Sequence, residues 1–224
     1  MQHRIISIGA LSRHEHQPAA APRTPHATTV LIESGDAKIL VDPGLPAQAV
    51  AARLTERTGL KPSDITHVFL TSFRPAHRAG LDAFPDAVWW IGENERERVG
   101  RGLVAQFEQE EDNAVRRILE AEIALLKKFR NAPDKLAPGV DLFPLPGFTP
   151  GTCGLVLAYP GRTVVVAGDA VATAEHLERG QVLRGAFNIE QAKESLLEVL
   201  EIADRIIPGH DNEQAGPGRR SPGG

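Results

Sequence analysis

The sequence predicts a layered α/β fold, because short strand-like and helix-like segments alternate along most of the chain. A chain of 224 residues, of which 42% are hydrophobic, suits one globular domain or one domain with an insertion. An insertion is indicated between residues 93 and 130, where the alternating pattern gives way to a long, charged helical pattern. We therefore expect one domain over residues 1–213, interrupted by a helical insert.

The first half of the chain contains the clearest strand signals. The segments "TTVLIESG" and "AKILVDPG" are separated by the turn-forming pair Gly35-Asp36, which predicts a β-hairpin. The next segment has helical spacing and ends on Gly59. In order, the predicted elements are strands over 28–35 and 37–44, a helix over 46–59, a buried strand over 65–72, a helix around 78–83 and a strand over 87–92.

The insert over residues 93–130 has the pattern of one or two amphipathic helices. Apolar residues recur there at steps of three and four, with charged residues on the opposite face. The spacing of Glu108, Glu111 and Asp112 predicts that they share one helix face, either solvated or folded over a neighbouring cleft. The apolar positions are Val115, Leu119, Ile123, Leu126 and Phe129.

The second half returns to strand patterns and closes with a helix. Strands are expected in "VDLFPLPG", "CGLVLAYPG" and "TVVVAGDA", followed by the helix "IEQAKESLLEVLEIA" and the segment "DRIIPGHD". Residues 214–224 are poor in apolar side chains and rich in glycine and proline, so we expect a disordered tail.

Composition excludes several classes of partner. A net charge of −4 gives no general attraction to nucleic acid or to an anionic membrane. The single Cys153 allows no internal disulfide and is expected to be a buried thiol. The N-terminal residues lack the apolar run of a signal peptide, and no segment is long enough to span a bilayer. These features predict a cytoplasmic protein that acts on a small molecule.

Five sequence blocks, taken in order, resemble the metallo-β-lactamase superfamily. They are "ILVDPG", "THVFLTSFRPAHRAGL", "PLPGFTPGTCGLVL", "TVVVAGDA" and "RIIPGHD". The resemblance runs from about Ile5 to Asp211 and leaves the helical insert outside the shared core. It implies a four-layer αββα sandwich with a metal site at the loop ends along one edge of the two sheets.

The resemblance also implies that the first of the family's two metal sites is lost. The family's H-x-H-x-D-H motif places its first two histidines at Ser72 and Arg74 in this chain. The histidine of the family's G-H-T-P-G motif falls on Phe148. Because all three ligands of that site are replaced, a two-metal centre is not expected.

The second metal site keeps most of its ligands under the same resemblance. The motif aspartate is replaced by Ala76, but His77, Asp169 and His210 match the remaining ligand positions. Two imidazoles and one carboxylate suit zinc or, with open positions, iron or manganese. The alternative is a site without metal, in which Arg74 pairs with Asp169 and supplies the positive charge.

Other residues are candidates for lining the same site. His14 and His16 have strand-like spacing in a segment that borders the active-site mouth in the family, although a polar loop explains them as well. His26 precedes a core strand and is the best candidate for an additional site residue. Asp42 is expected to hydrogen-bond the backbone of a site loop, and His176 either lines the cleft or lies on a loop surface.

Two functions follow from these residues. In the first, one metal on His77, Asp169 and His210 serves a hydrolase that cleaves an ester, thioester, lactone or phosphoester. Asp169 then acts as ligand and proton acceptor, and Arg74 stabilises the developing oxyanion. In the second, the chain is a catalytically inactive pseudoenzyme that binds a ligand or partner through the cleft or the insert. The insert is a candidate homodimer interface in either case.

Overall fold

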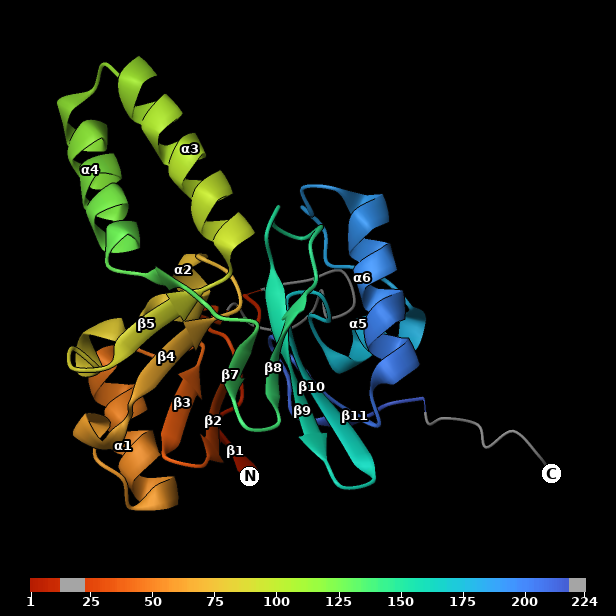
Figure 1. Ribbon diagram of the computed structural model, residues 1–224. Helices are drawn as coiled ribbons and strands as arrows, with labels where there is room; N and C mark the ends of the chain where they lie inside the picture. The colour runs from red at the N-terminus through yellow and green to blue at the C-terminus, as the bar shows by residue number, and fades with distance from the viewer. Residues whose placement is uncertain (13–22, 218–224) are drawn as a thin grey trace.

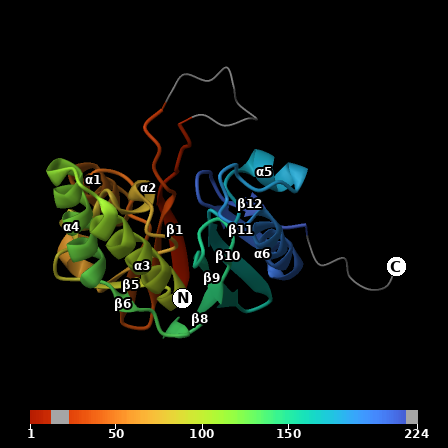
Figure 2. The ribbon, with the colours of Figure 1, turned by 90° about the horizontal axis from the view of Figure 1, so that it is seen from above.

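The computed structural model describes residues 1–12 and 23–217, which form two six-stranded sheets packed face to face with helices on both outer faces (Figure 1). This is the four-layer arrangement that the family resemblance implied. Viewed from above, α1 to α4 lie on the side of the first sheet, and α5 and α6 lie on the side of the second (Figure 2). His14 and His16 lie outside the described residues.

The first sheet has the order β1-β2-β3-β4-β5-β6, antiparallel from β1 to β3 and parallel from β3 to β6. The predicted hairpin is confirmed, since β2 and β3 are joined by the turn at Gly35 and Asp36. The strands are β1 Gln2–Ser7, β2 Thr29–Ser34, β3 Ala37–Val41, β4 His67–Leu70, β5 Val88–Ile91 and β6 Arg130–Asn131.

The second sheet has the order β12-β11-β10-β9-β8-β7, with a parallel pair at β10 and β11. The first residues of the expected disordered tail instead form β12, which pairs with β11. The strands are β7 Lys135–Ala137, β8 Val140–Pro144, β9 Cys153–Tyr159, β10 Arg162–Gly168, β11 Arg205–Pro208 and β12 Gln214–Ala215.

The helices pack their apolar faces on the sheets. The helix expected around residues 78–83 is divided into α2 and the short 3-10 helix η2, because the chain turns at Gly80. The helices are α1 Ala47–Thr58, η1 Pro62–Asp64, α2 Pro75–Arg78, η2 Leu81–Ala83, α3 Glu93–Gln109, α4 Asn113–Lys127, α5 Ala174–Arg179 and α6 Ile189–Ile202. None of the helices in the described part of the chain has the length and hydropathy needed to cross a bilayer.

Three apolar clusters fill the spaces between the four layers. The central cluster joins the facing sides of the sheets and includes Phe69 of the first sheet and Leu155 of the second. A second cluster packs Leu54 of α1 on the outer face of the first sheet, and a third packs Leu196 of α6 on the outer face of the second sheet. Burial of this apolar surface is the main force that holds the sheets together.

The insert folds as a helical hairpin of α3 and α4 that projects beyond the first sheet (Figure 1). Asp112 caps α4, since its Oδ1 accepts hydrogen bonds from the backbone N–H of Ala114 and Val115 at 2.6 and 3.3 Å. The prediction that Glu108, Glu111 and Asp112 share a helix face is therefore wrong, because α3 ends before Glu111 and Asp112.

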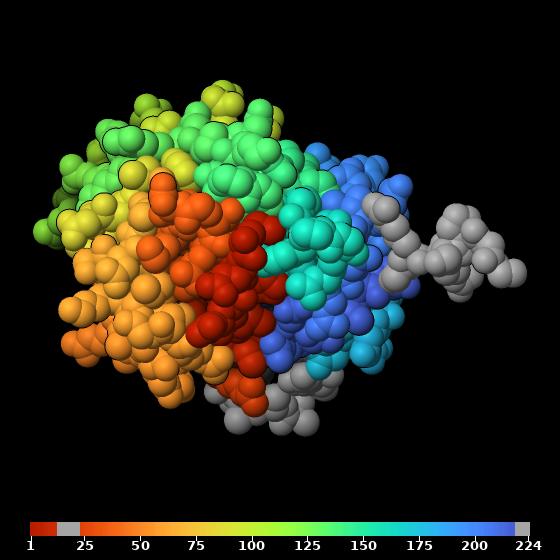
Figure 3. Space-filling model, turned by 60° about the horizontal axis from the view of Figure 1, so that its bottom comes forward, coloured from red at the N-terminus to blue at the C-terminus, as the bar shows by residue number. Residues whose placement is uncertain are grey.

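Strand β1 is an edge strand of the first sheet, and its side chains also contact the second sheet. The N-terminal residues lie between the two halves of the molecule in the space-filling view, where they are red (Figure 3). His3 Nδ1 lies 2.7 Å from the hydroxyl of Tyr159, and His3 Nε2 lies 3.2 Å from Glu213 Oε2. These contacts close one end of the interface between the sheets.

Candidate metal centre

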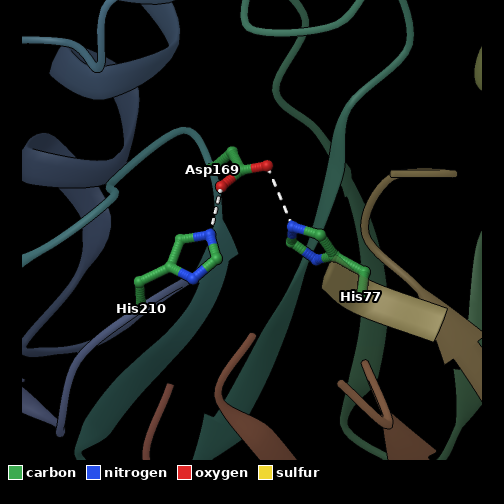
Figure 4. Close-up of side chains that lie close together, drawn as sticks. All are labelled: His77, Asp169 and His210. Atoms are coloured by element: carbon green, nitrogen blue, oxygen red, sulfur yellow. Dashed lines mark hydrogen bonds and ion pairs between the residues drawn. The ribbon is translucent and has the colours of Figure 1, made fainter. Parts of the chain in front are cut away.

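Three polar side chains meet where strands of both sheets end. His77 lies on α2 after β4, Asp169 follows β10, and His210 follows β11. His77 Nε2 lies 2.9 Å from Asp169 Oδ2, and His210 Nε2 lies 3.0 Å from Asp169 Oδ1 (Figure 4). One ligand atom from each residue can be chosen so that all lie within 4.8 Å of one another, and all three residues are buried. The structure thus brings together the three ligands that the sequence retained.

His77 is oriented by a carboxylate behind it. Its Nδ1 lies 3.0 Å from Asp42 Oδ2 and 3.2 Å from the hydroxyl of Thr71. Asp42 also accepts hydrogen bonds from the Thr71 backbone N–H at 2.8 Å and from the Thr71 hydroxyl at 2.6 Å. The expected bond from Asp42 to loop backbone is present, and the same carboxylate turns the Nε2 of His77 toward Asp169. A carboxylate bonded to the outer nitrogen is the usual support of a metal-binding histidine.

His210 is oriented by a backbone carbonyl. Its Nδ1 donates to the carbonyl oxygen of His26 at 2.9 Å, which directs Nε2 toward Asp169. The side chain of His26 does not enter the site, because its ring nitrogens lie 3.1 and 3.2 Å from the carbonyl oxygens of Thr24 and Ile8. His26 therefore supports the site through its backbone, and its imidazole is no ligand.

The charges of the cluster reinforce one another. Burial alone would lower the pKa of His77, but the charges of Asp169 and Asp42, together with hydrogen bonds to both carboxylates, raise it to about 10. Burial alone would raise the pKa of Asp169, but the charge of His77 and hydrogen bonds from His210 and His77 hold it well below its usual value. Without a metal, His77 is an imidazolium, and a metal ion that binds at Nε2 must displace that proton.

The positions of the lost first site are connected to the cluster through Arg74. Arg74 Nη1 donates a hydrogen bond to Asp169 Oδ2 at 2.8 Å, which is the pairing predicted for a site without metal. The guanidinium carbon of Arg74 lies 4.7 Å from the centre of the Phe148 ring. The Ser72 hydroxyl is buried without a hydrogen-bond partner among the described residues. A guanidinium thus stands beside the carboxylate where the resemblance places a second cation.

His176 does not join the site. It lies on α5 and is fully buried, with Nδ1 2.8 Å from the hydroxyl of Thr173, the residue that caps this helix. It belongs to neither the loop surface nor the cluster of potential ligands. The helix α5 was not predicted, and this explains the error.

The cluster has the donor set of a single-metal site. It offers two imidazole nitrogens and one carboxylate, which suits zinc, iron or manganese with positions left open. Each imidazole has its outer nitrogen bonded to an oxygen, so both Nε2 atoms face the same point. Among the described residues this is the one group of three or more such donors found within ligand distance. We conclude that residues His77, Asp169 and His210 fit one divalent metal ion.

Two residues near the site gave no usable signal in the sequence. Thr71 is buried beside Asp42 and His77, but its hydroxyl is indistinguishable from other strand-end threonines in sequence. Glu95 is only 1% exposed and bonds two loops of the site, although it stands in the glutamate-rich stretch "ENERER". No local sequence pattern distinguishes Glu95 from the solvent-exposed glutamates beside it.

Comparison with known proteins identifies the family to which this fold belongs. The family model of the metallo-beta-lactamase superfamily matches residues 23–210, and the chain belongs to that superfamily. A search of curated protein sequences finds no significant match.

Solved structures confirm the fold. AidC, a dizinc quorum-quenching lactonase, aligns with a TM-score of 0.67 and 19% identity over 88% of this chain and 77% of its own. A putative metallo-beta-lactamase from Thermotoga maritima aligns with a TM-score of 0.66 and 18% identity over 96% of this chain and 98% of its own. A variant of AiiA from B. thuringiensis, bound to N-decanoyl-L-homoserine, aligns with a TM-score of 0.63 and 20% identity over 93% of this chain and 92% of its own.

Proposed function

We propose that this protein is a hydrolase of small carboxylic esters or lactones that uses one divalent metal ion on His77, Asp169 and His210. The observation that carries the proposal is the orientation of both histidines, whose Nε2 atoms face Asp169 while Asp42 and the His26 carbonyl hold the opposite nitrogens. A bound ion supplies Lewis acidity and a water molecule of lowered pKa, which are the needs of ester hydrolysis.

The remaining steps fall to the chain's own residues. Asp169 is buried and held as a carboxylate, so it is suited to ligate the ion and to orient a water molecule, whereas its lowered pKa makes it a weak proton acceptor. Arg74 is the accessible member of the group, with its side chain 37% exposed. Its fixed positive charge lies where it can stabilise the oxyanion that forms when water attacks a carbonyl group.

The choice of ester or lactone rests on the structural neighbours. AidC is described as a lactonase, and the AiiA variant was solved with N-decanoyl-L-homoserine at its active site. Both are below 25% identity, so they suggest a class of substrate to test. A phosphodiester is disfavoured because its cleavage commonly uses two metal ions, and the first site has no ligands here.

A pseudoenzyme is the second candidate, and one observation favours it. Both oxygens of Asp169 are occupied by His77, His210 and Arg74, so the cluster is satisfied without any metal. In that case the cleft or the α3/α4 hairpin binds a ligand or a second copy of the chain. The hairpin exposes Val104, Val115 and Ile118, the last at 63%. Light scattering of the parent and of a variant lacking residues 101–130 tests this interface.

Hydrolysis assays separate the two candidates. The protein, first stripped with chelator and then loaded with zinc, iron or manganese, is assayed on 4-nitrophenyl acetate and on N-hexanoyl homoserine lactone. We expect turnover that is lost in Asp169→Asn and kept in Asp36→Asn, which alters an exposed carboxylate in the β2–β3 turn. Absence of turnover with every metal and both substrates would favour the pseudoenzyme.

A further inference from the structure

The carboxylate of Glu95 joins two loops that are far apart in the sequence. Glu95 is the third residue of α3 and is buried. Its Oε1 accepts a hydrogen bond from the backbone N–H of Phe73 at 2.9 Å. Its Oε2 accepts from the Thr149 hydroxyl at 2.6 Å and from the backbone N–H of Gly151 at 3.2 Å. One side chain therefore satisfies three donors, and none of them belongs to its own helix.

The two loops are the ones that carry the lost ligands of the first metal site. Phe73 lies between Ser72 and Arg74, and Thr149 follows Phe148. In the family these loops are joined through a metal ion that both of them ligate. Here the donors are gone, and the buried carboxylate of the helical insert connects the same two segments of backbone.

The hairpin also holds the first loop from a second direction. The carbonyl oxygen of Phe73 accepts a hydrogen bond from Arg78 Nε at 2.8 Å, and the Arg78 guanidinium lies 4.2 Å from the centre of the Phe73 ring. The same guanidinium forms an ion pair with Glu122 on α4. Both the N–H and the C=O of Phe73 are thereby fixed by contacts that depend on the α3/α4 hairpin.

The second loop packs closely against the helix that carries Glu95. A Cβ atom added at Gly151 would collide with the backbone nitrogen of Glu95, so the second loop lies directly against the first turn of α3. Burial raises the pKa of Glu95, while its hydrogen bonds with Thr149, Phe73 and Gly151 oppose this shift. A buried carboxylate is tolerated here because each of its oxygens has a donor.

We propose that Glu95 is a positioning residue that replaces the cross-link of the lost first metal, holding the Arg74 and Phe148 loops together so that Arg74 stays paired with Asp169. The pairing follows from geometry, because Arg74 contacts both Asp169 and Phe148. Glu95 in turn bonds Phe73, which precedes Arg74, and Thr149, which follows Phe148. The consequence for catalysis rests on the proposed hydrolase function, whereas the cross-link itself does not.

The Glu95→Gln variant tests the cross-link in metal-free protein. Glutamine offers one acceptor oxygen in place of two, and its NH2 group faces a donor. We expect the backbone amide that faces the new NH2 group, that of Phe73 or that of Gly151, to exchange at least about tenfold faster, and the guanidinium proton signals of Arg74 to broaden or shift. The matched control is Glu97→Gln on the same helix, which alters an exposed carboxylate paired with Arg101 and is expected to leave both readouts unchanged.

Thr149→Val provides a second variant that keeps the carboxylate. It removes the Thr149 hydroxyl from Oε2 and from the Thr152 hydroxyl, and leaves the Gly151 N–H as the remaining donor to Oε2. We expect faster exchange at Gly151 while the amide of Phe73 stays protected. The proposal would be overturned if the amides of Phe73 and Gly151 and the Arg74 signals behave in these variants as they do in Glu97→Gln. It would also be overturned if all core amides accelerate by the same factor, since Glu95 would then act only on global stability.

Catalytic measurements separate this inference from the proposed function. If the zinc-loaded parent hydrolyses 4-nitrophenyl acetate, we expect Glu95→Gln to lower kcat about tenfold or more with a small change in KM, because Arg74 is misplaced in the transition state. If the parent shows no turnover, the proposed function fails. The exchange and Arg74 readouts then still decide whether Glu95 links the loops.

Discussion

The substitution Asp42→Asn tests how His77 is prepared to bind a metal. Asp42 is 2% exposed and has a φ of 47°, a conformation that asparagine tolerates, so the replacement adds no backbone strain. The asparagine oxygen can still accept from the Thr71 backbone N–H, which leaves its NH2 group facing His77 Nδ1. That nitrogen must then accept a hydrogen bond, and the ring proton moves to Nε2. Because Nε2 is the ligand atom, the variant holds His77 in the wrong tautomer.

The magnitude follows from this loss of orientation. Removal of the partner of a metal-binding histidine lowers metal affinity about 10–100-fold, equivalent to about 1.4–2.7 kcal/mol of binding free energy. Competition with a chromophoric chelator at neutral pH measures the zinc affinity of the variant beside that of Asp36→Asn, the exposed control. An affinity in Asp42→Asn within twofold of the control would refute the reasoning that Asp42 sets the tautomer.

Three further predictions concern the same buried region. In metal-free protein kept in chelator, the His77 imidazolium contributes its full stabilisation below pH 6.5, the ordinary pKa of histidine, and this contribution is lost as the pH rises to about 10. The urea concentration at the midpoint of unfolding should therefore fall between these pH values in the parent and not in His77→Gln. Burial, aided by the charge of Glu95, raises the pKa of Cys153 to about 12, so a thiol reagent at pH 8 should modify the denatured chain and leave the folded one unmodified. The triple variant Ser72→His/Arg74→His/Phe148→His restores the donors of the first site, and its zinc content by elemental analysis should rise from about one ion to two; a content unchanged from the parent would show that the site cannot be rebuilt by ligands alone.

Local patterns in the sequence were sufficient to predict most of the strands and helices, and the family resemblance supplied their arrangement. The hairpin of β2 and β3 was predictable because Gly35-Asp36 is a turn signal between two alternating strands. Strand β1 was not predicted, since its partner β2 begins more than twenty residues later in the sequence, too far away for a local hairpin signal. The split between α2 and η2 also escaped prediction. It is set by tertiary packing, because a side chain at Gly80 would crowd the carbonyl oxygen of Leu45.

Only the residues of the site that lie in the family motifs were predictable. The resemblance placed His77, Asp169 and His210 together, and the structure has them within ligand distance. The contact between Asp42 and His77 depends on β3 lying parallel to β4, which the sequence does not state. The bonds of Glu95 depend on how the insert docks on the two loops, and a long amphipathic pattern gives no information about that.

Metal content is the most direct test of the account. The protein is purified without added metal, incubated with zinc, iron or manganese, and analysed beside the double variant His77→Ala/His210→Ala. The account predicts about one metal ion per chain in the parent and none in the variant, because the cluster offers one set of donors. Absence of bound metal in the parent with all three ions, or equal binding in the variant, would contradict the claim that His77, Asp169 and His210 form a metal centre.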